Sequence, residues 1–263
     1  ITLDNTHFIN NHSDNGGAIY FTLGRIDITN SKFINNTSTG NGGALFIDSS
    51  RSLIQSSYFE GNQSDGNGGG LYAYFATLVI RDGFFIKNRV TGNGNGNWGG
   101  GMHTNHVNLT ITESQFYQNE APHNGGAVGV INPILAGIDP EEDPLLQQID
   151  EVPIVSDMLT SIPGFQSTLE AHPSGIYVEF NEDIQIHNNC FANNATHDPL
   201  DPNWTSGIHA SAAMADNNYW GHPSGPSGRG PGIGDSVGKN KVTFVPFLTE
   251  APSFCDAELT EIK

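Results

Sequence analysis

The stretch FINNHSDNGGAI, residues 8–19, contains the two short motifs that determine the fold of this chain. The first motif is Phe-x-x-Asn, from Phe8 to Asn11, and the second is Asn-Gly-Gly, from Asn15 to Gly17. Both motifs recur along the sequence. The Phe-x-x-Asn pairs are Phe8 and Asn11, Phe33 and Asn36, Phe59 and Asn62, Phe85 and Asn88, Phe116 and Asn119, and Phe191 and Asn194.

The spacing of these motifs identifies a solenoid. The first four phenylalanines of the series are 25, 26 and 26 residues apart. From the second glycine of a pair to the next Phe the distance is 16 residues, as from Gly17 to Phe33, and Gly175 to Phe191 repeats it. Length varies instead in the turn between Asn and the glycine pair, as in the longer turn at 92–98. A constant frame with variable turns is typical of stacked repeats.

Apolar residues alternate inside this frame. Ile26 and Ile28 precede Phe33, and Leu78 and Ile80 precede Phe85. A period of two indicates short strands with one face inward, and a further strand is expected after each glycine pair. Two or three short strands in each coil of about 26 residues predict an all-β fold, a right-handed parallel β-helix.

The repeated residues are interpreted as structural. Each Phe of the series is predicted to point inward and stack on the Phe of the next coil. Each Asn of the Phe-x-x-Asn motif is predicted to lie at a corner and to join a ladder of amide hydrogen bonds, because an amide side chain has both donors and an acceptor.

Composition narrows the classes of partner. The 263 residues contain 10 Lys and Arg against 28 Asp and Glu, a formal net charge of -18. A field of that sign disfavours nucleic acid and anionic lipid. The sequence has no run of 18 apolar residues to span a membrane and no signal peptide at Ile1, so we expect a piece of a larger exported protein. In such a protein Cys190 and Cys255 are either a disulfide or two free thiols.

Three stretches combine Phe-x-x-Asn with Gly-Gly-Ala and an aliphatic residue: 8–19, 33–45 and 116–128. This combination resembles the repeat of the chlamydial polymorphic membrane proteins. The resemblance covers residues 1 to about 130 and resumes at about 175–195, while the glycine pairs at 68 and 99 continue with Gly instead of Ala. It implies surface display, adhesion and an autotransporter passenger domain.

The C-terminal stretch carries a second resemblance. Residues 216–226, 232–237 and 242–248 are similar to the ending of many exported bacterial and archaeal β-helices. The resemblance implies that Trp220 takes the Phe position of the last coil, that 221–234 folds over the end, and that 242–248 is the final strand. Residues 1–8 instead align with 26–33, so we expect further coils or another subunit at the N-terminal edge, where head-to-tail self-assembly could occur.

We therefore expect one β-helix domain over residues 1–263. It comprises regular coils at 1–130, an inserted loop at 131–174, the last coils at 175–220, and a C-terminal cap and tail at 221–263. The insertion is either one divergent coil with a loop or a single long excursion. A long loop on a rigid scaffold often carries function, and a tolerated surface loop is the alternative.

The sequence offers few catalytic groups, and no catalytic residue is assigned. Arg25, Arg51 and Asp183 share one offset and are expected on a solvated outer face. His103 and His106 lack a third zinc ligand, and no GxSxG, HExxH or P-loop motif occurs. Calcium is the one cofactor considered, with oxygen ligands at Asp14, Asp65 and the acids of 139–143, although no ligand set is assigned.

Seven Asn-x-Ser/Thr sequons occur. Those that coincide with the Phe-x-x-Asn motif are expected to be tied up in the ladder, which leaves Asn35, Asn108 and Asn203 as the glycan acceptors if the source glycosylates.

Two functions compete. The first is a non-catalytic extracellular or cell-surface module, an adhesin or a structural subunit of an appendage or filament, whose partners are other protein subunits or surface glycans. The alternative is a carbohydrate-active β-helix, a lyase or hydrolase with a groove beside the insertion, or a glycan-binding domain. Catalysis by such an enzyme would need a carboxylate pair or a positioned base.

Overall fold

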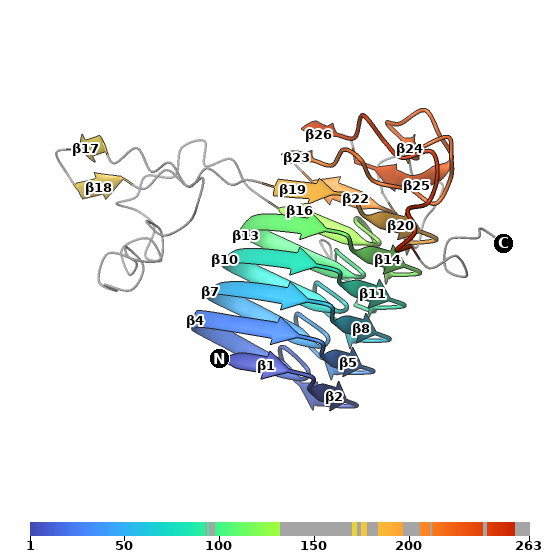
Figure 1. Cartoon of the computed structure of the whole chain (residues 1–263). Helices are drawn as coiled ribbons and strands as arrows, with labels where there is room; N and C mark the ends of the chain where they lie inside the picture. Colours follow the sequence, from blue (N-terminus) through green and yellow to red (C-terminus); the bar gives the residue numbers. More distant parts are fainter. Residues whose placement is uncertain are drawn as a thin grey trace. The chain divides into compact units, whose positions relative to one another are not determined.

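The computed structural model describes residues 1–92, 94, 98–131, 170–172, 175–177, 184–196, 206–210, 212–238 and 241–255, and its regular elements are β-strands. The strands form stacked parallel sheets, and each turn of the chain contributes one strand to each sheet (Figure 1). The parallel β-helix expected from the sequence is confirmed. None of the described residues belongs to a helix long and apolar enough to cross a membrane.

The first sheet contains the longest strands. Each of its four central strands has 11 residues and pairs in parallel and in register with the next. They are β4 (Ile19–Thr29), β7 (Leu45–Gln55), β10 (Leu71–Arg81) and β13 (Met102–Thr112). The short strand β1 (Thr2–Asp4) pairs with the second half of β4.

The second and third sheets are narrower. The second sheet holds the Phe series and consists of β2 (His7–Ile9), β5 (Lys32–Ile34), β8 (Tyr58–Glu60), β11 (Phe84–Ile86), β14 (Gln115–Tyr117) and β20 (Cys190–Ala192). The third sheet consists of β3 (His12–Ser13), β6 (Thr37–Ser38), β9 (Gln63–Ser64), β12 (Arg89–Val90), β15 (Glu120–Ala121) and β21 (Ala195–Thr196). Asn of the Phe-x-x-Asn motif lies at the corner between these two sheets.

Each long strand of the first sheet bends in its middle. The bend residue has a positive φ in four successive coils: 54° at Leu23, 46° at Ser49, 43° at Phe75 and 55° at His106. Pairing continues on both sides, as in Thr22 with Asp48 and Gly24 with Ser50. The two strands that the sequence predicts on either side of this point are therefore the two arms of one bent strand.

The insertion begins at this bend. Strand β16 (Val128–Ile131) pairs with the first arm of β13, and β19 (Ile184–His187) pairs with its second arm. Residues 132–183 therefore replace the bend of one strand. Pro133–Glu182 form a separate compact unit. Its described part is an antiparallel pair of β17 (Glu170–His172) and β18 (Gly175–Tyr177).

This arrangement corrects one expected boundary. The distance from Gly175 to Phe191 suggested that the coils resume at 175, but Gly175 pairs with His172 in the inserted unit. The coils resume at Ile184, which pairs with Leu109. The 16-residue match at Gly175 is a coincidence of spacing, because a single glycine specifies no strand pairing by itself.

The C-terminal end of the coil stack is closed. Strand β22 (Ile208–Ala210) pairs with β16, and β23 (Ala212–Met214) pairs with β19. Trp220 is fully buried and stacks on Phe191, with ring centroids 5.0 Å apart. The remaining strands are β24 (Pro226–Gly228), β25 (Gly234–Val237) and β26 (Lys241–Thr243). The last strand is shorter than the expected 242–248 and ends before Pro246, which has no N–H to donate.

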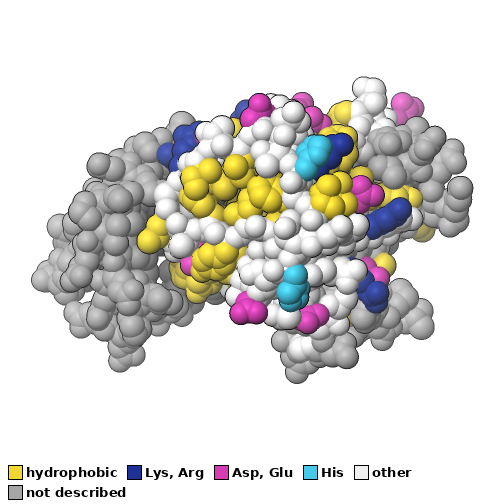
Figure 2. Space-filling view, turned by 90° about the horizontal axis from the view of Figure 1, so that it is seen from below, with side chains coloured by type: hydrophobic (Ala, Val, Ile, Leu, Met, Phe, Trp, Pro, Cys, Tyr) yellow, Lys and Arg dark blue, Asp and Glu magenta, His cyan; other side chains and the backbone are white. Residues whose placement is uncertain are grey.

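The N-terminal end of the stack is different. The strands β1, β2 and β3 are the terminal strands of their sheets. Seen from below, apolar side chains gather over this coil (Figure 2), and Leu3, Phe8 and Ile19 pack on the core while remaining partly exposed.

Candidate functional site

The six phenylalanines of the repeat form one internal column. Successive ring centroids lie 4.6 to 5.2 Å apart from Phe8 to Phe191, and the rings are within 12° of parallel. From Phe33 onward these rings are at most 1% exposed. Stacked rings of this kind stabilise the coil-to-coil contact, and no ligand can reach them.

The asparagines of the repeat form a ladder with a fixed direction. The Asn36 side-chain oxygen accepts hydrogen bonds from the backbone N–H and the amide of Asn11, at 3.0 and 2.9 Å. Its own amide donates to the side-chain oxygen of Asn62 and to the backbone oxygen of Phe8. Asn62, Asn88, Asn119 and Asn194 repeat this pattern. The sequons at Asn11, Asn36, Asn62 and Asn194 are therefore engaged in structure.

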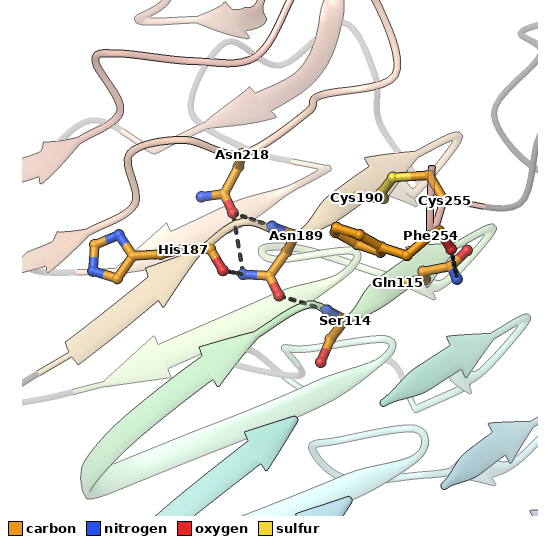
Figure 3. Close-up of a disulfide and its surroundings, with 8 residues drawn as sticks. All are labelled: Ser114, Gln115, His187, Asn189, Cys190, Asn218, Phe254 and Cys255. Carbon is orange, nitrogen blue, oxygen red and sulfur yellow. Dashed lines mark hydrogen bonds between the residues drawn. A yellow bond between two sulfur atoms is a disulfide. The ribbon is translucent and has the colours of Figure 1, made fainter. Parts of the chain in front are cut away.

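A second polar ladder, which was not expected from the sequence, lies at the neighbouring corner, two residues before the repeat Phe, and is interrupted at Gly83. The backbone N–H of Ser31 donates to the Ser57 hydroxyl at 3.1 Å. Further up the stack, Ser114 N–H donates to Asn189 and Asn189 N–H donates to Asn218, both at 2.9 Å. Figure 3 shows these last steps. The recurrent serine at this offset was the available signal.

The Asn ladder ends on a carboxylate. The amide of Asn194 donates to Asp235 Oδ2 at 2.6 Å, and its backbone N–H donates to the same oxygen at 3.3 Å. Asp235 lies in β25, which pairs in parallel with β22, and its own N–H donates to the backbone oxygen of Trp220. Burial raises the pKa of Asp235 from 3.8 to about 7, although the bonds from Asn194 act in the opposite direction. This buried acid is the one ionisable member of the ladder.

The two cysteines form a disulfide, which settles the alternative left open by the sequence. Cys190 lies on the outer side of the second sheet, and Cys255 belongs to the segment after the cap. The side-chain amide of Gln115 donates to the backbone oxygen of Phe254 at 2.7 Å (Figure 3). Together these contacts hold residues 252–255 against the outer face of β14 and β20.

Replacing Cys255 by serine is expected to lower the free energy of unfolding by about 3 kcal/mol, because a bridge that closes a long loop restricts the unfolded chain. The sequence separation of the two cysteines is 65. Urea unfolding followed by circular dichroism measures the change. Unfolding of the native chain with reductant should give the same loss, and an unchanged midpoint in both experiments would contradict the prediction.

An aromatic column covers the first arm of the long strands on their outer side. Tyr20, Phe46, Tyr72 and His103 occupy equivalent positions, with neighbouring ring centroids 4.8 to 5.6 Å apart. The next coil has Gly129 at this position, and Trp98 lies beside it, edge-on to both His103 and His209. Trp98 stands where the other coils have the Asn before the glycine pair, as Asn67 does one coil earlier, and its ring lies beside the position left open by Gly129.

This aromatic column accounts for the burial of His103. The ring is 1% exposed, and Nδ1 has no hydrogen-bond partner among the described residues. Burial, with a smaller contribution from His209, lowers the pKa of His103 from 6.5 to about 3. His106 lies instead at the bend and stacks on Phe75. The structure therefore separates the two histidines that were considered as zinc ligands.

His103→Phe is expected to stabilise the chain in acid. The folded pKa lies below the unfolded one, so the unfolded chain takes up the proton first and stability is lost as pH falls from 6.5 towards 3. The variant should exceed the wild type by about 2 kcal/mol at pH 5 and by much less at pH 7.5. Urea titrations at both pH values measure this. An equal difference at both would contradict the assigned protonation.

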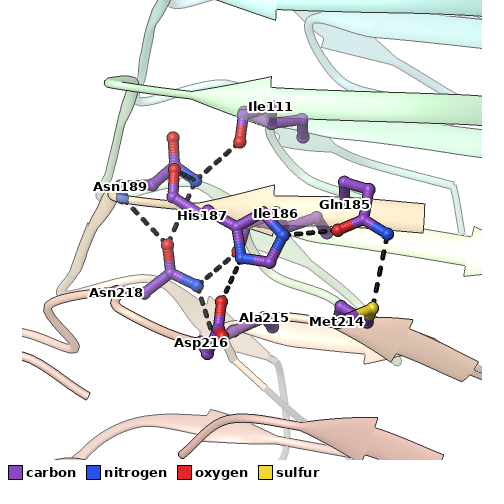
Figure 4. Close-up of polar contacts among 9 residues, drawn as sticks. All are labelled: Ile111, Gln185, Ile186, His187, Asn189, Met214, Ala215, Asp216 and Asn218. Atoms are coloured by element: carbon purple, nitrogen blue, oxygen red, sulfur yellow. Dashed lines mark hydrogen bonds and ion pairs between the residues drawn. The ribbon is translucent and has the colours of Figure 1, made fainter. Parts of the chain in front are cut away.

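A polar cluster near the cap contains residue types used in catalysis, but its polar groups already contact one another. His187 Nδ1 forms an ion pair with Asp216, and Nε2 is 2.5 Å from the side-chain oxygen of Gln185 (Figure 4). The Gln185 amide contacts the sulfur of Met214 at 3.3 Å. Both ring nitrogens therefore contact polar groups of the fold. The cluster links β19 to the coil above it.

The other candidates lie on the surface. Arg25 and Arg51 are paired in register on the outer side, and Arg25 forms a 3.0 Å ion pair with Asp27. Asp14 and Asp65 accept hydrogen bonds from Thr39 and Thr91. Asp183 and the acids of 139–143 lie outside the described residues. Within the described ranges, no group of three or more His, Cys, Asp or Glu could hold a metal ion.

The glycosylation candidates have different surroundings. Asn35 is exposed in a turn with φ of 53°. Asn108 is half-buried on the outer side of β13 and pairs in register with Thr77. Asn203 lies outside the described residues. Of the two that the structure describes, Asn35 is the more exposed residue.

Aromatic and polar side chains that are exposed or partly exposed gather at the bend of the long strands. We call it the bend patch and define it by Thr22, Leu23, Asp48, Ser49, Tyr74, Phe75, Asn105 and His106. These residues share two adjacent positions in four successive coils. The patch could not be predicted from the sequence, because the positive φ at the bend cannot be read from these residue types.

Comparison with known proteins gives one match. The Chlamydia polymorphic membrane protein repeat matches residues 5–22, 30–48 and 56–74. Each match runs from the turn before a repeat Phe, through the glycine pair, to the first arm of the next long strand. No curated protein and no solved structure matches the chain. The chain is thus a parallel β-helix with three matches to the Chlamydia polymorphic membrane protein repeat, the repeat of a surface-protein family.

Proposed function

We propose that this chain is a non-catalytic adhesive module displayed at a cell surface. The observation that carries the proposal is the threefold match to the Chlamydia polymorphic membrane protein repeat. The net charge of -18 agrees with an exported protein that contacts neither nucleic acid nor anionic lipid. The disulfide agrees with an oxidising, extracellular location.

The architecture supports a binding role for the outer surface. The repeat Phe and Asn side chains form the Phe column and the Asn ladder, so the interior offers no accessible functional group to a ligand. A stack held by such ladders is rigid, and rigid scaffolds present recognition side chains at low entropic cost. Adhesion therefore depends on outward side chains and on segments that leave the coils.

Assembly at the N-terminal edge would be selective for a coil of the same repeat. Each ladder oxygen accepts from the coil before it, as Asn36 does from Asn11. A strand added at this edge would thus need to supply matching donors to Asn11. The opposite end of this chain is covered by Trp220 and Asp235. Head-to-tail contact between two copies would therefore meet a cap, and another coil of the repeat is the better partner.

Adhesion of beads coated with the purified chain to cultured epithelial cells tests the proposed function. We expect beads carrying the native chain to adhere several-fold more than beads carrying the chain after reduction and heat denaturation. Equal adhesion of the two would contradict the proposal. Turnover in a screen of polysaccharide substrates would favour the carbohydrate-active alternative.

A further inference from the structure

The bend patch has a backbone conformation that its residues do not favour. A positive φ costs an L-residue roughly 1–2 kcal/mol, and only Gly and Asn adopt it readily. Most equivalent turns of the described part use Asn or other polar residues, as at Asn5, Asn30 and Asn188. Among the positive-φ residues other than glycine in the described part, only Leu23 and Phe75 are hydrophobic. Bulky residues retained at such positions indicate a role for their side chains.

These two side chains face outward. Leu23 is 64% exposed, and Phe75 is partly exposed. One face of the Phe75 ring stacks on His106, with centroids 4.5 Å apart and an interplanar angle of 16°, and Tyr74 contacts it edge-on. In the neighbouring coil the equivalent position is Ser49, whose side chain is too short to cover an aromatic ring. Phe75 is partly exposed next to this serine position.

Hydrogen-bonding groups lie in the neighbouring coil, where Asp48 pairs in register with Tyr74. The Ser49 hydroxyl donates to Asp48 Oδ1 at 2.9 Å, and the Tyr20 hydroxyl lies 3.4 Å from Asp48 Oδ2. The carboxylate and the two hydroxyls can accept and donate hydrogen bonds in the same small area. A ring face flanked by such groups suits a sugar ring, because the ring binds C–H groups on its negative face while the sugar hydroxyls bond to the polar groups.

Charge and burial narrow the choice of ligand. The bend patch contains no Lys or Arg, it includes Asp48, and the chain carries -18 overall, so sialylated and sulfated glycans are disfavoured. An apolar peptide would cover Leu23 and Phe75 but would also bury the Asp48 carboxylate between them without a cationic partner, which is costly. A neutral glycan leaves that carboxylate hydrogen-bonded.

We propose that the bend patch binds a neutral hexopyranose unit of a glycan, with Phe75 as the stacking platform and Asp48 and Ser49 as hydrogen-bonding groups. The inference rests on the proposed adhesive function and names its ligand class and site. It also gives a reason for the conformation of Phe75, whose replacement by glycine would relieve the backbone.

The test uses the full chain on an array of neutral, sialylated and sulfated glycans, followed by calorimetric titration with the neutral oligosaccharide that binds most strongly. Phe75→Gly removes the ring and suits a φ of 43°, so the variant should fold. We expect it to bind at least tenfold more weakly, and Asp48→Asn to bind several-fold more weakly. Lys87→Gly is the matched control, since it removes another long side chain at a positive φ, 54°, outside the patch.

Three results would overturn the inference: no binding to neutral glycans, binding to charged glycans alone, or unchanged binding by Phe75→Gly. Competition by an apolar peptide with no glycan binding would overturn it as well. Bead adhesion separates this failure from failure of the proposed function. If Phe75→Gly beads adhere as the wild type does, the module is adhesive through another site. If wild-type beads do not adhere, the function itself is wrong.

Discussion

Asn62→Ala is expected to lower the free energy of unfolding by about 3–5 kcal/mol. The Asn62 oxygen accepts from the backbone N–H and amide of Asn36, and its amide donates to Phe33 O and to Asn88. Asn62 is fully buried, so alanine would leave several polar groups without partners or water, at about 1–3 kcal/mol each. Urea unfolding followed by circular dichroism measures the loss.

The control is a variant of Asn35, at the equivalent corner of the preceding coil. Asn35 is the neighbour of Asn36 and is exposed with a φ of 53°, and Asn35→Gly, which suits that φ, should change stability by less than about 1 kcal/mol. Asn62→Asp tests the direction of the ladder, because a carboxylate can still accept from Asn36 but cannot donate to Phe33 O. It should be about as destabilising as alanine. A loss below about 1 kcal/mol for Asn62→Ala would mean that neighbouring coils adjust to replace its bonds.

The coil was predictable because the residues that determine its structure recur in successive coils. Phe85 and Asn88 have the same inward and corner positions as Phe59 and Asn62 one coil earlier, so each position is read several times in the sequence. A strand face is set by period two, and a frame of constant length fixes which residues stack. These constraints are local or act between adjacent coils, which is why a single sequence suffices to recognise them.

The insertion boundary was not predictable for the opposite reason. Gly175 satisfies the spacing to Phe191 but pairs with His172, while Ile184 continues the coil without any preceding glycine pair. The two halves of the interrupted strand, β16 and β19, keep their register because both pair with β13. That register is a property of the neighbouring coil. No motif within residues 132–183 records it.

The candidate surface was hidden because it depends on backbone conformation. Four residues share this offset from the repeat Phe but differ in type: Leu23, Ser49, Phe75 and His106. Leu and Phe are unusual at a positive φ, whereas Ser and His occur there in isolated turns. The arms on either side are normal strand sequence. Asp235 was hidden in a similar way, since an acid far along the chain takes the place of the next ladder Asn only after the cap has folded.

Asp235→Asn is expected to stabilise the chain above neutral pH. The folded pKa of Asp235 is about 7 and the ordinary value is 3.8, so the folded chain keeps a proton that the unfolded chain has released. Stability from this group is complete below pH 3.8 and falls as pH rises towards 7. At about 1.4 kcal/mol per pH unit, this interval corresponds to roughly 4 kcal/mol. An asparagine avoids the loss, because its oxygen accepts from Asn194 as the other ladder residues do.

The pH dependence distinguishes this mechanism from general stabilisation of the cap. Unfolding by urea at pH 4 should give nearly equal stabilities for Asp235→Asn and the wild type, and at pH 8 the variant should be more stable by about 2–4 kcal/mol. Asp216→Asn is the control, since this acid is paired with His187 and is partly exposed. A constant advantage of Asp235→Asn at both pH values would show that Asp235 is ionised throughout, with the ladder ending on a solvated charge. A growing advantage would establish that the ladder ends on a protonated acid.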